Sequence, residues 1–202
     1  MSVATAINPP SGLDLSDDEP VWPITVAMYA DMIRLGILDE KARVYLWKGR
    51  LAERMPPNPP HSDAVKASYD FLGRVLPPGF DVDRERPMSL TLHPSVPQPD
   101  IAVIRGRFKD FAPQFFPATV VAFIVEVSDT TLAKDRKPVF TYAAEGIPVY
   151  WLLNLASRRL EVHSEPADGT YTRVTPFGLD EEAPMVLDGR EVGRVRVADL
   201  LP

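Results

Sequence analysis

The chain has 202 residues, of which 45% are hydrophobic and 25% are charged, so it can bury a full hydrophobic core. It contains no cysteine, which excludes disulfides, thiolate chemistry and cysteine-bound zinc. Its formal net charge of −6 argues against strong non-specific binding to nucleic acid, because basic side chains on phosphates supply most of that affinity.

The first 20 residues differ in composition from the rest of the chain. Small residues, prolines and an acidic cluster from Asp14 to Glu19 predict a loosely ordered arm over residues 1–20. Residues 21–202 are expected to fold as one domain. There is no apolar run of membrane length and no basic-then-apolar signal at the start, so we expect a cytoplasmic protein with no membrane partner.

Two helices with a hairpin between them are predicted in the first third of the chain. The helices are expected over about residues 25–35 and 62–76. Residues 43–55 alternate around Lys48-Gly49, which predicts two strands joined by a tight turn. His61 opens the second helix, where it either caps the helix at the surface or contacts a substrate phosphate and transfers a proton.

The remaining elements predict an α/β fold with a mixed central β-sheet flanked by helices. Strands are expected at 81–84, 89–92, 101–104, 119–127 and 149–154. A helix from about Pro138 to Glu145 precedes the last of these strands, and hairpins follow around Asp168-Gly169 and Asp188-Gly189. His93 and His163 lack metal-ligand spacing and are assigned no role.

Asp100 and Glu126 are carboxylates at the ends of two predicted strands. Asp100 follows Pro99 at a strand entrance, and Glu126 closes the unbroken apolar run 119–125, which is typical of a central strand covered on both faces. A buried, unpaired glutamate costs several kcal/mol, so this one needs a cation or hydrogen-bond donors. Two carboxylates completed by water suit Mg²⁺ or Mn²⁺ better than zinc.

Two interpretations of these carboxylates stay open. In the first, a bound divalent metal polarises a scissile phosphate and lowers the pKa of a water molecule, while a nearby lysine ammonium stabilises charge on the phosphate. In the second, Asp100 caps a turn, Glu126 pairs with Arg136 or Lys137, and no metal binds.

The order of these motifs resembles the Uma2 family of the PD-(D/E)XK nuclease superfamily. The likeness covers roughly residues 21–165 and includes Pro99-Asp100, Glu126-Val127-Ser128 and the segment from Tyr142 to Trp151. It implies a restriction-endonuclease-like fold and a metal-dependent endonuclease that hydrolyses DNA phosphodiester bonds. It also implies Asp100 and Glu126 as Mg²⁺ or Mn²⁺ ligands, with the backbone carbonyl of Val127 as a third. A homodimer would suit the two antiparallel strands of a duplex.

The chain departs from the family pattern at the catalytic lysine. The superfamily's usual lysine two residues after the glutamate is Ser128 here, so the resemblance implies a lysine from the start of the following helix. Lys137 is the nearest match, and Lys134 is the alternative. The chain is one residue shorter than the family's usual spacing between Asp135 and Tyr142, and one residue turns a helix by about 100°, so Lys137 is expected to point in a different direction from the family's lysine. Pro138 follows Lys137 directly.

The predicted hairpin also departs from the pattern. Lys48 and Arg50 flank the turn glycine where the family tends to carry acidic residues. Glu53 matches an acidic position of the family and is either a third carboxylate of the site or a solvent-facing strand residue between basic neighbours.

Three functional classes are compatible with these residues. The first is the metal-dependent nuclease, the second is a catalytically weakened module that binds nucleic acid or a protein partner without cleavage, and the third is an interaction domain whose carboxylates only form salt bridges. A local basic face near the site in sequence favours contact with DNA, although a solvated rim explains it equally well. Its members are Arg105, Arg107, Lys109, Lys134, Arg136 and Lys137.

Overall fold

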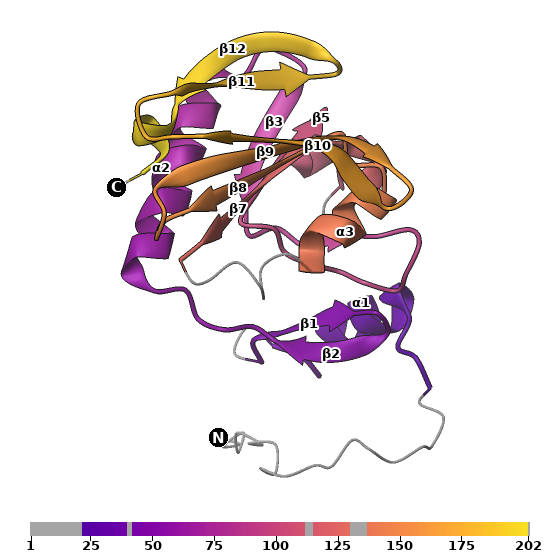
Figure 1. Cartoon of the computed structure of the whole chain (residues 1–202). Helices are drawn as coiled ribbons and strands as arrows, with labels where there is room; N and C mark the ends of the chain where they lie inside the picture. The colour runs from indigo at the N-terminus through magenta and orange to yellow at the C-terminus, as the bar shows by residue number, and fades with distance from the viewer. Residues whose placement is uncertain (1–21, 40–41, 112–114, 130–136, 202) are drawn as a thin grey trace.

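The computed structural model describes residues 22–39, 42–111, 115–129 and 137–201 (Figure 1). Its centre is a six-stranded sheet with the strand order β10-β9-β8-β7-β5-β3. The strands are β3 (Phe80–Arg84), β5 (Ile101–Arg105), β7 (Val121–Ser128), β8 (Val149–Asn154), β9 (Arg159–Ala167) and β10 (Thr170–Phe177). Strands β7 and β8 are parallel, and the other neighbouring pairs of this sheet are antiparallel. The predicted α/β fold with a mixed central sheet is therefore confirmed.

Helices cover both faces of the sheet. Helix α2 (Pro59–Val75) packs on one face, and α3 (Lys137–Ala144), which connects β7 to β8, packs on the other (Figure 1). Alternate residues of β7 serve the two cores, since successive side chains of a strand point to opposite faces. Phe123 and Val125 belong to the core under α2, whereas Ile124 belongs to the core under α3.

Two hairpins lie at opposite ends of the molecule. Helix α1 (Val26–Arg34) and the hairpin β1 (Val44–Trp47) and β2 (Arg50–Glu53) lie below the sheet in Figure 1 and share a small core of Tyr29, Leu46 and Val96. The other hairpin lies at the top of that view, where the following 3₁₀ turn packs into the core with α2. These elements are β11 (Glu182–Leu187), β12 (Arg190–Arg196) and η3 (Val197–Leu200).

The shorter elements connect the main strands. They are β4 (Met88–Ser89), β6 (Phe116–Pro117), η1 (Phe108–Phe111) and η2 (Ala118–Val120). The prediction of a strand over 89–92 is wrong beyond Ser89, because the backbone N–H groups of Thr91 and Leu92 donate to the carboxylate of Glu145 instead of a neighbouring strand.

Helix α2 begins three residues earlier than the sequence predicted. The Asn58 side chain caps it by accepting a hydrogen bond of 3.0 Å from the N–H of His61. Pro59 and Pro60 occupy the first two helical positions, where a missing N–H costs nothing. His61 therefore lies inside the first turn of the helix.

None of the helices in the described ranges is both long and apolar enough to cross a membrane. The predicted arm over residues 1–20 falls outside the described residues, and the single domain over 21–202 stays a prediction.

Candidate active site

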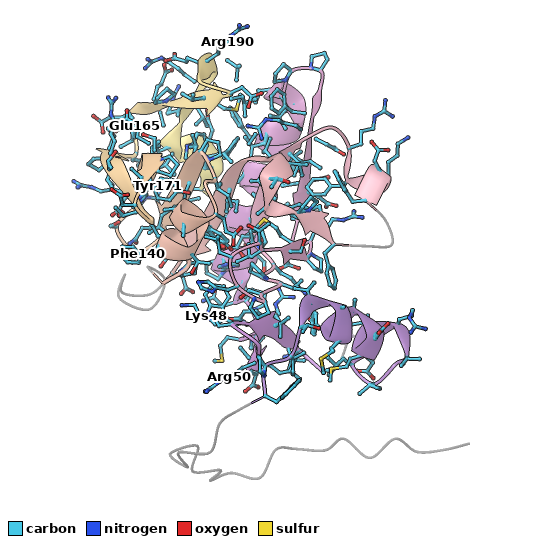
Figure 2. All side chains as sticks on the ribbon, turned by 90° about the vertical axis from the view of Figure 1, so that its right-hand side faces the viewer. Lys48, Arg50, Phe140, Glu165, Tyr171 and Arg190 are labelled. Atoms are coloured by element: carbon cyan, nitrogen blue, oxygen red, sulfur yellow. The ribbon has the colours of Figure 1, made fainter. Side chains whose placement is uncertain are left out.

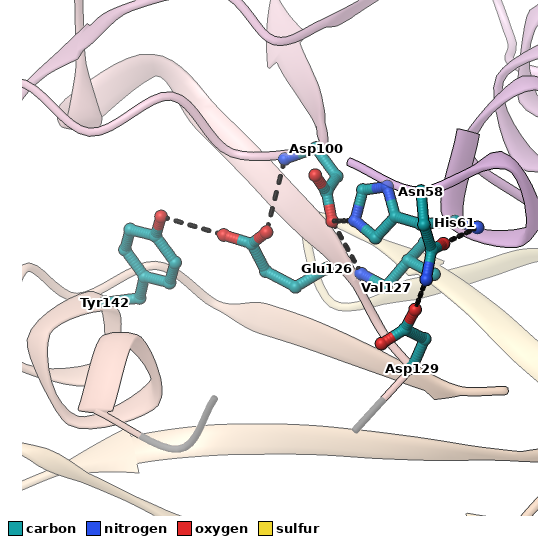
Figure 3. A network of polar contacts seen from close by, with 7 residues as sticks. All are labelled: Asn58, His61, Asp100, Glu126, Val127, Asp129 and Tyr142. Atoms are coloured by element: carbon teal, nitrogen blue, oxygen red, sulfur yellow. Dashed lines mark hydrogen bonds and ion pairs between the residues drawn. The ribbon is translucent and has the colours of Figure 1, made fainter. Parts of the chain in front are cut away.

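Asp100 and Glu126 lie side by side at one end of the central sheet. The register pairs Ile101 with Val125, so the next pair outward in this antiparallel ladder is Asp100 and Glu126. The backbone N–H of Asp100 donates to Glu126 Oε2 at 3.3 Å, and the N–H of Val127 donates to Asp100 Oδ2 at 2.7 Å (Figure 3). The strand pairing alone therefore brings the two carboxylates together.

Glu126 is a largely buried carboxylate beside another negative charge. Its Oε1 accepts a hydrogen bond of 3.0 Å from the hydroxyl of Tyr142 on α3, because Glu126 continues the Ile124 face of β7 (Figure 3). Burial raises the pKa of the Glu126 carboxyl well above its usual range, and the charge of Asp100 raises this pKa further. The same burial, followed by the Glu126 charge, raises the pKa of Tyr142 and keeps its hydroxyl a donor.

The start of α2 reaches the same carboxylates. His61 Nε2 lies 3.1 Å from Asp100 Oδ2, and the two side chains are only 18% and 15% exposed. This hydrogen bond is the main cause that raises the pKa of His61. The Asn58 cap donates its side-chain amide to Asp129 just beyond β7, so the first turn of α2 is tied to both strands that carry the carboxylates (Figure 3).

A pocket of about 730 Å³ opens over these groups. Its described lining is acidic, with five carboxylates against Arg54 and His61. The five are Glu53, Glu85, Asp100, Glu126 and Asp129. The other walls are largely aromatic side chains and prolines from the β1–β2 hairpin and the segments next to Asp100 and α3.

The structure brings together four of the positions predicted from sequence, namely Asp100, Glu126, Val127 and His61. Glu53 lines the same pocket, but it is exposed, and none of the hydrogen bonds or ion pairs found among the described residues joins it to Asp100 or Glu126. Its register partner is Val44. Glu53 therefore lies on one face of the hairpin, and Tyr45 lies on the other face.

The lysine candidates fall at the edge of what is described. Lys137 is the first residue of α3, but its side chain lies outside the described residues, and so does all of Lys134. Ser128, at the usual lysine position, is buried at the end of β7.

Sequence reasoning missed Tyr142, Asn58 and Asp129 as members of the site. Asn58 carried a usable signal, because an asparagine directly before two prolines is typical of a helix N-terminus. Tyr142 carried none, since its contact with Glu126 depends on how α3 crosses β7.

The predicted basic face is wrong at Arg105, because this residue ends β5 at the opposite end from Asp100. Its guanidinium pairs with Asp188 at 2.5 Å instead of facing the site. Arg107 and Lys109 follow at that same far end. Lys134 and Arg136 lie outside the described residues.

The donor set fits a hard divalent cation. Within the described ranges, no cluster of three or more histidine, aspartate or glutamate side chains is arranged to hold a metal, so a metal here would be held by fewer side chains and completed by other ligands. Two adjacent carboxylates and a backbone carbonyl leave positions for water, which Mg²⁺ usually retains. A cation would also offset the repulsion between the Glu126 and Asp100 charges, which contributes to the raised pKa of Glu126.

The comparisons with known proteins identify a family and a shared fold. A family model described as "Uma2: Putative restriction endonuclease" matches residues 27–194. The chain belongs to the Uma2 family. This membership supports a nuclease-type function.

One solved structure shares the Uma2 chain's fold, although its sequence is only 16% identical. It is described as a "putative nuclease" from Anabaena variabilis, and the match has a TM-score of 0.67 and covers 88% of this chain and 97% of that one. No curated protein matches the chain.

Proposed function

We propose that this Uma2 protein is a divalent-metal-dependent endonuclease that hydrolyses DNA phosphodiester bonds. The observation that carries the proposal is the largely buried Glu126 carboxylate beside Asp100 in a pocket. Among the described residues, no lysine or arginine forms an ion pair with either carboxylate. A bound cation would offset both charges and lower the raised pKa of Glu126.

In this proposal Asp100, Glu126 and the carbonyl of Val127 hold Mg²⁺ or Mn²⁺. When bound, such an ion supplies Lewis-acid polarisation of the phosphate and a nucleophilic water at neutral pH. Tyr142 orients Glu126 through its hydroxyl, and His61 orients Asp100 while facing the pocket that receives the phosphate. Lys137 is assigned the role of the superfamily's lysine, and Glu53 an outer position on the pocket wall.

A second candidate function has one specific observation in its favour. The usual lysine position is the buried Ser128, so the motif itself supplies no ammonium group to the site. A module that binds nucleic acid or a protein partner without cutting would retain the metal site and the pocket but show no cleavage.

The test is cleavage of single- and double-stranded DNA by the purified full chain in Mg²⁺, Mn²⁺ or EDTA. We expect metal-dependent cleavage that is lost in Asp100→Asn and Glu126→Gln and lowered in Lys137→Ala. Glu161→Gln is the matched control, because it also neutralises a carboxylate next to a histidine but lies outside the pocket. Cleavage by both carboxylate variants at the wild-type rate would overturn the proposal.

A further inference from the structure

The hairpin β1–β2 presents an aromatic surface to the pocket that contains Asp100 and Glu126. Tyr45 and Trp47 both line this pocket, and their ring centroids lie 6.2 Å apart at an interplanar angle of 62°. Alternation along β1 puts them on one face, while Leu46 between them is buried in the small core with Tyr29 and Val96. The hairpin core thus fixes both rings from behind.

These rings lie close to the proposed catalytic groups. The pKa of Tyr45 is raised first by burial and then by the charge of Glu126, so its hydroxyl is within electrostatic reach of that carboxylate. Trp47 is half-buried against the core under α3. Both aromatic side chains are anchored at the pocket wall rather than free at the surface.

Two exposed positive charges continue this surface. Arg50 is the register partner of Trp47 and therefore lies on the same face of the hairpin, and Lys48 occupies the turn beside it (Figure 2). Both are exposed, and neither forms an ion pair with any residue in the described ranges. Aromatic rings followed by basic side chains form the combination that holds a single strand by base stacking and phosphate contacts.

The pocket is better suited to a single strand than to a duplex. Its volume of about 730 Å³ falls in the range of small-molecule clefts and cavities, roughly 300–1,000 Å³, so this open pocket has room for a nucleotide that has left the base stack. A duplex keeps its bases stacked inside and is held through many phosphate contacts. The acidic lining of this pocket provides few such contacts.

We infer that the site accepts a single-stranded nucleic acid segment, with a base stacked on Tyr45 and Trp47 and flanking phosphates on Lys48 and Arg50. The inference rests on the proposed nuclease function, since it names the substrate class of the same pocket. The strand then leads from the basic hairpin turn across the aromatic rings to Asp100 and Glu126.

The test measures binding separately from cleavage. Fluorescence anisotropy of the full chain with labelled single-stranded DNA, single-stranded RNA and duplex DNA of one sequence is recorded in Ca²⁺, which fills oxygen sites. We expect single-stranded DNA or single-stranded RNA to bind about tenfold or more tighter than duplex DNA. Trp47→Leu should weaken that binding by about tenfold, while Trp47→Phe, which keeps a ring, retains most of it.

The charge arm uses a matched pair of double variants. Lys48→Ala with Arg50→Ala should reduce the salt slope of single-strand binding by about 1.4, the value for two lost phosphate contacts. Arg190→Ala with Arg196→Ala removes the same charge from the exposed β11–β12 hairpin and should leave the slope unchanged (Figure 2). Phe140→Leu, on the exposed side of α3, is the aromatic control.

Tighter binding to duplex than to both single strands would overturn the inference, and so would wild-type affinity in a folded Trp47→Leu variant. If no substrate is cleaved in Mg²⁺ or Mn²⁺ but single strands still bind through Trp47, the nuclease proposal fails and the assignment of the strand stands. If single strands are cleaved but Trp47→Leu binds and cuts normally, the nuclease proposal stands and the assignment of the strand to the aromatic rings fails.

Discussion

A histidine contacts a carboxylate in two regions of the described structure, and only one of these regions has the features of a catalytic site. His61 lies 3.1 Å from Asp100 at the pocket, and His163 lies 3.2 Å from Glu161 on β9. The distances are almost the same. The surroundings differ, because the Tyr150 and Tyr171 rings pack against the His163 ring in edge-to-face arrangements, at centroid distances of 5.4 and 5.9 Å.

The difference lies in the second carboxylate. Next to Asp100 is Glu126, whose pKa is raised by burial and by the Asp100 charge, and both residues line a pocket. On β9, by contrast, His163 belongs to an aromatic cluster with Tyr150 and Tyr171 from the neighbouring strands β8 and β10. A histidine–carboxylate pair is therefore structural by itself, and the second, largely buried carboxylate is what supports the proposal of a cation site at Asp100.

The largest expected effect compares Glu126→Gln with Glu161→Gln. Loss of the Glu126 charge should lower the Mg²⁺-dependent cleavage rate by about 100-fold or more, because charge stabilisation in the transition state is lost. Glu161→Gln should change the rate by less than about twofold, since a surface or packing ion pair contributes little. Initial rates at saturating Mg²⁺ measure both, and equal losses in the two variants would remove the distinction between the regions.

The next effect is on stability and its pH dependence. The folded pKa of Glu126 is raised, so its contribution to folding is fully present below the unfolded carboxyl pKa and is lost as pH rises through the folded pKa. Metal-free Glu126→Gln should therefore be more stable than wild type at pH 8, by about 1–3 kcal/mol. The gap should close at acid pH, where Glu126 is protonated.

Urea denaturation in EDTA across this pH range measures that difference, with Glu161→Gln as the control for the substitution itself. A Glu126→Gln variant less stable than wild type at pH 8 would contradict the assigned electrostatics.

Tyr142 and Tyr171 sharpen the same comparison through their hydroxyls. Tyr142 donates to Glu126 at 3.0 Å, and Tyr171 donates to the backbone carbonyl of Ile147 at 2.9 Å. Tyr142→Phe should weaken Mn²⁺ binding by about tenfold, the lower end of the range for groups that orient metal ligands. Tyr171→Phe should leave the affinity unchanged in calorimetric titrations, and a matching loss there would show that the effect is only structural.

The smallest expected effect separates the caps of two helices. Asn58→Ala and Thr25→Ala remove the N-caps of α2 and α1, and each should cost about 1 kcal/mol of unfolding free energy. Only Asn58→Ala should also slow cleavage, because Asn58 ties the first turn of α2 to Asp129 and positions His61. Thermal unfolding combined with cleavage rates checks this, and equal slowing by Thr25→Ala would count against it.

Much of the fold follows from local sequence signals. The turns at Lys48-Gly49, Asp168-Gly169 and Asp188-Gly189 are confirmed, and in each the first residue adopts a positive φ of 49° before a glycine that also does. The strand predicted over 119–127 is a central strand from Val121 onward, as its lack of alternation predicted, but Thr119 and Val120 belong to the 3₁₀ turn η2 instead.

The parts that the sequence did not predict depend on contacts between distant segments. Tyr142 meets Glu126 because α3 crosses over β7 on its way to the parallel strand β8, and no local pattern carries that information. Arg105 follows Asp100 by five positions, yet an extended strand moves it about 16 Å away, to the other end of the sheet. Closeness in sequence was therefore a poor guide to the charge around the site.

The most direct test of the central claim is a calorimetric titration of Mn²⁺ into metal-free wild type, Glu126→Gln and Glu161→Gln. The account predicts binding by wild type and Glu161→Gln and its loss in Glu126→Gln. Equal binding by all three proteins, or none by wild type, would contradict the assignment of Asp100 and Glu126 as a metal site.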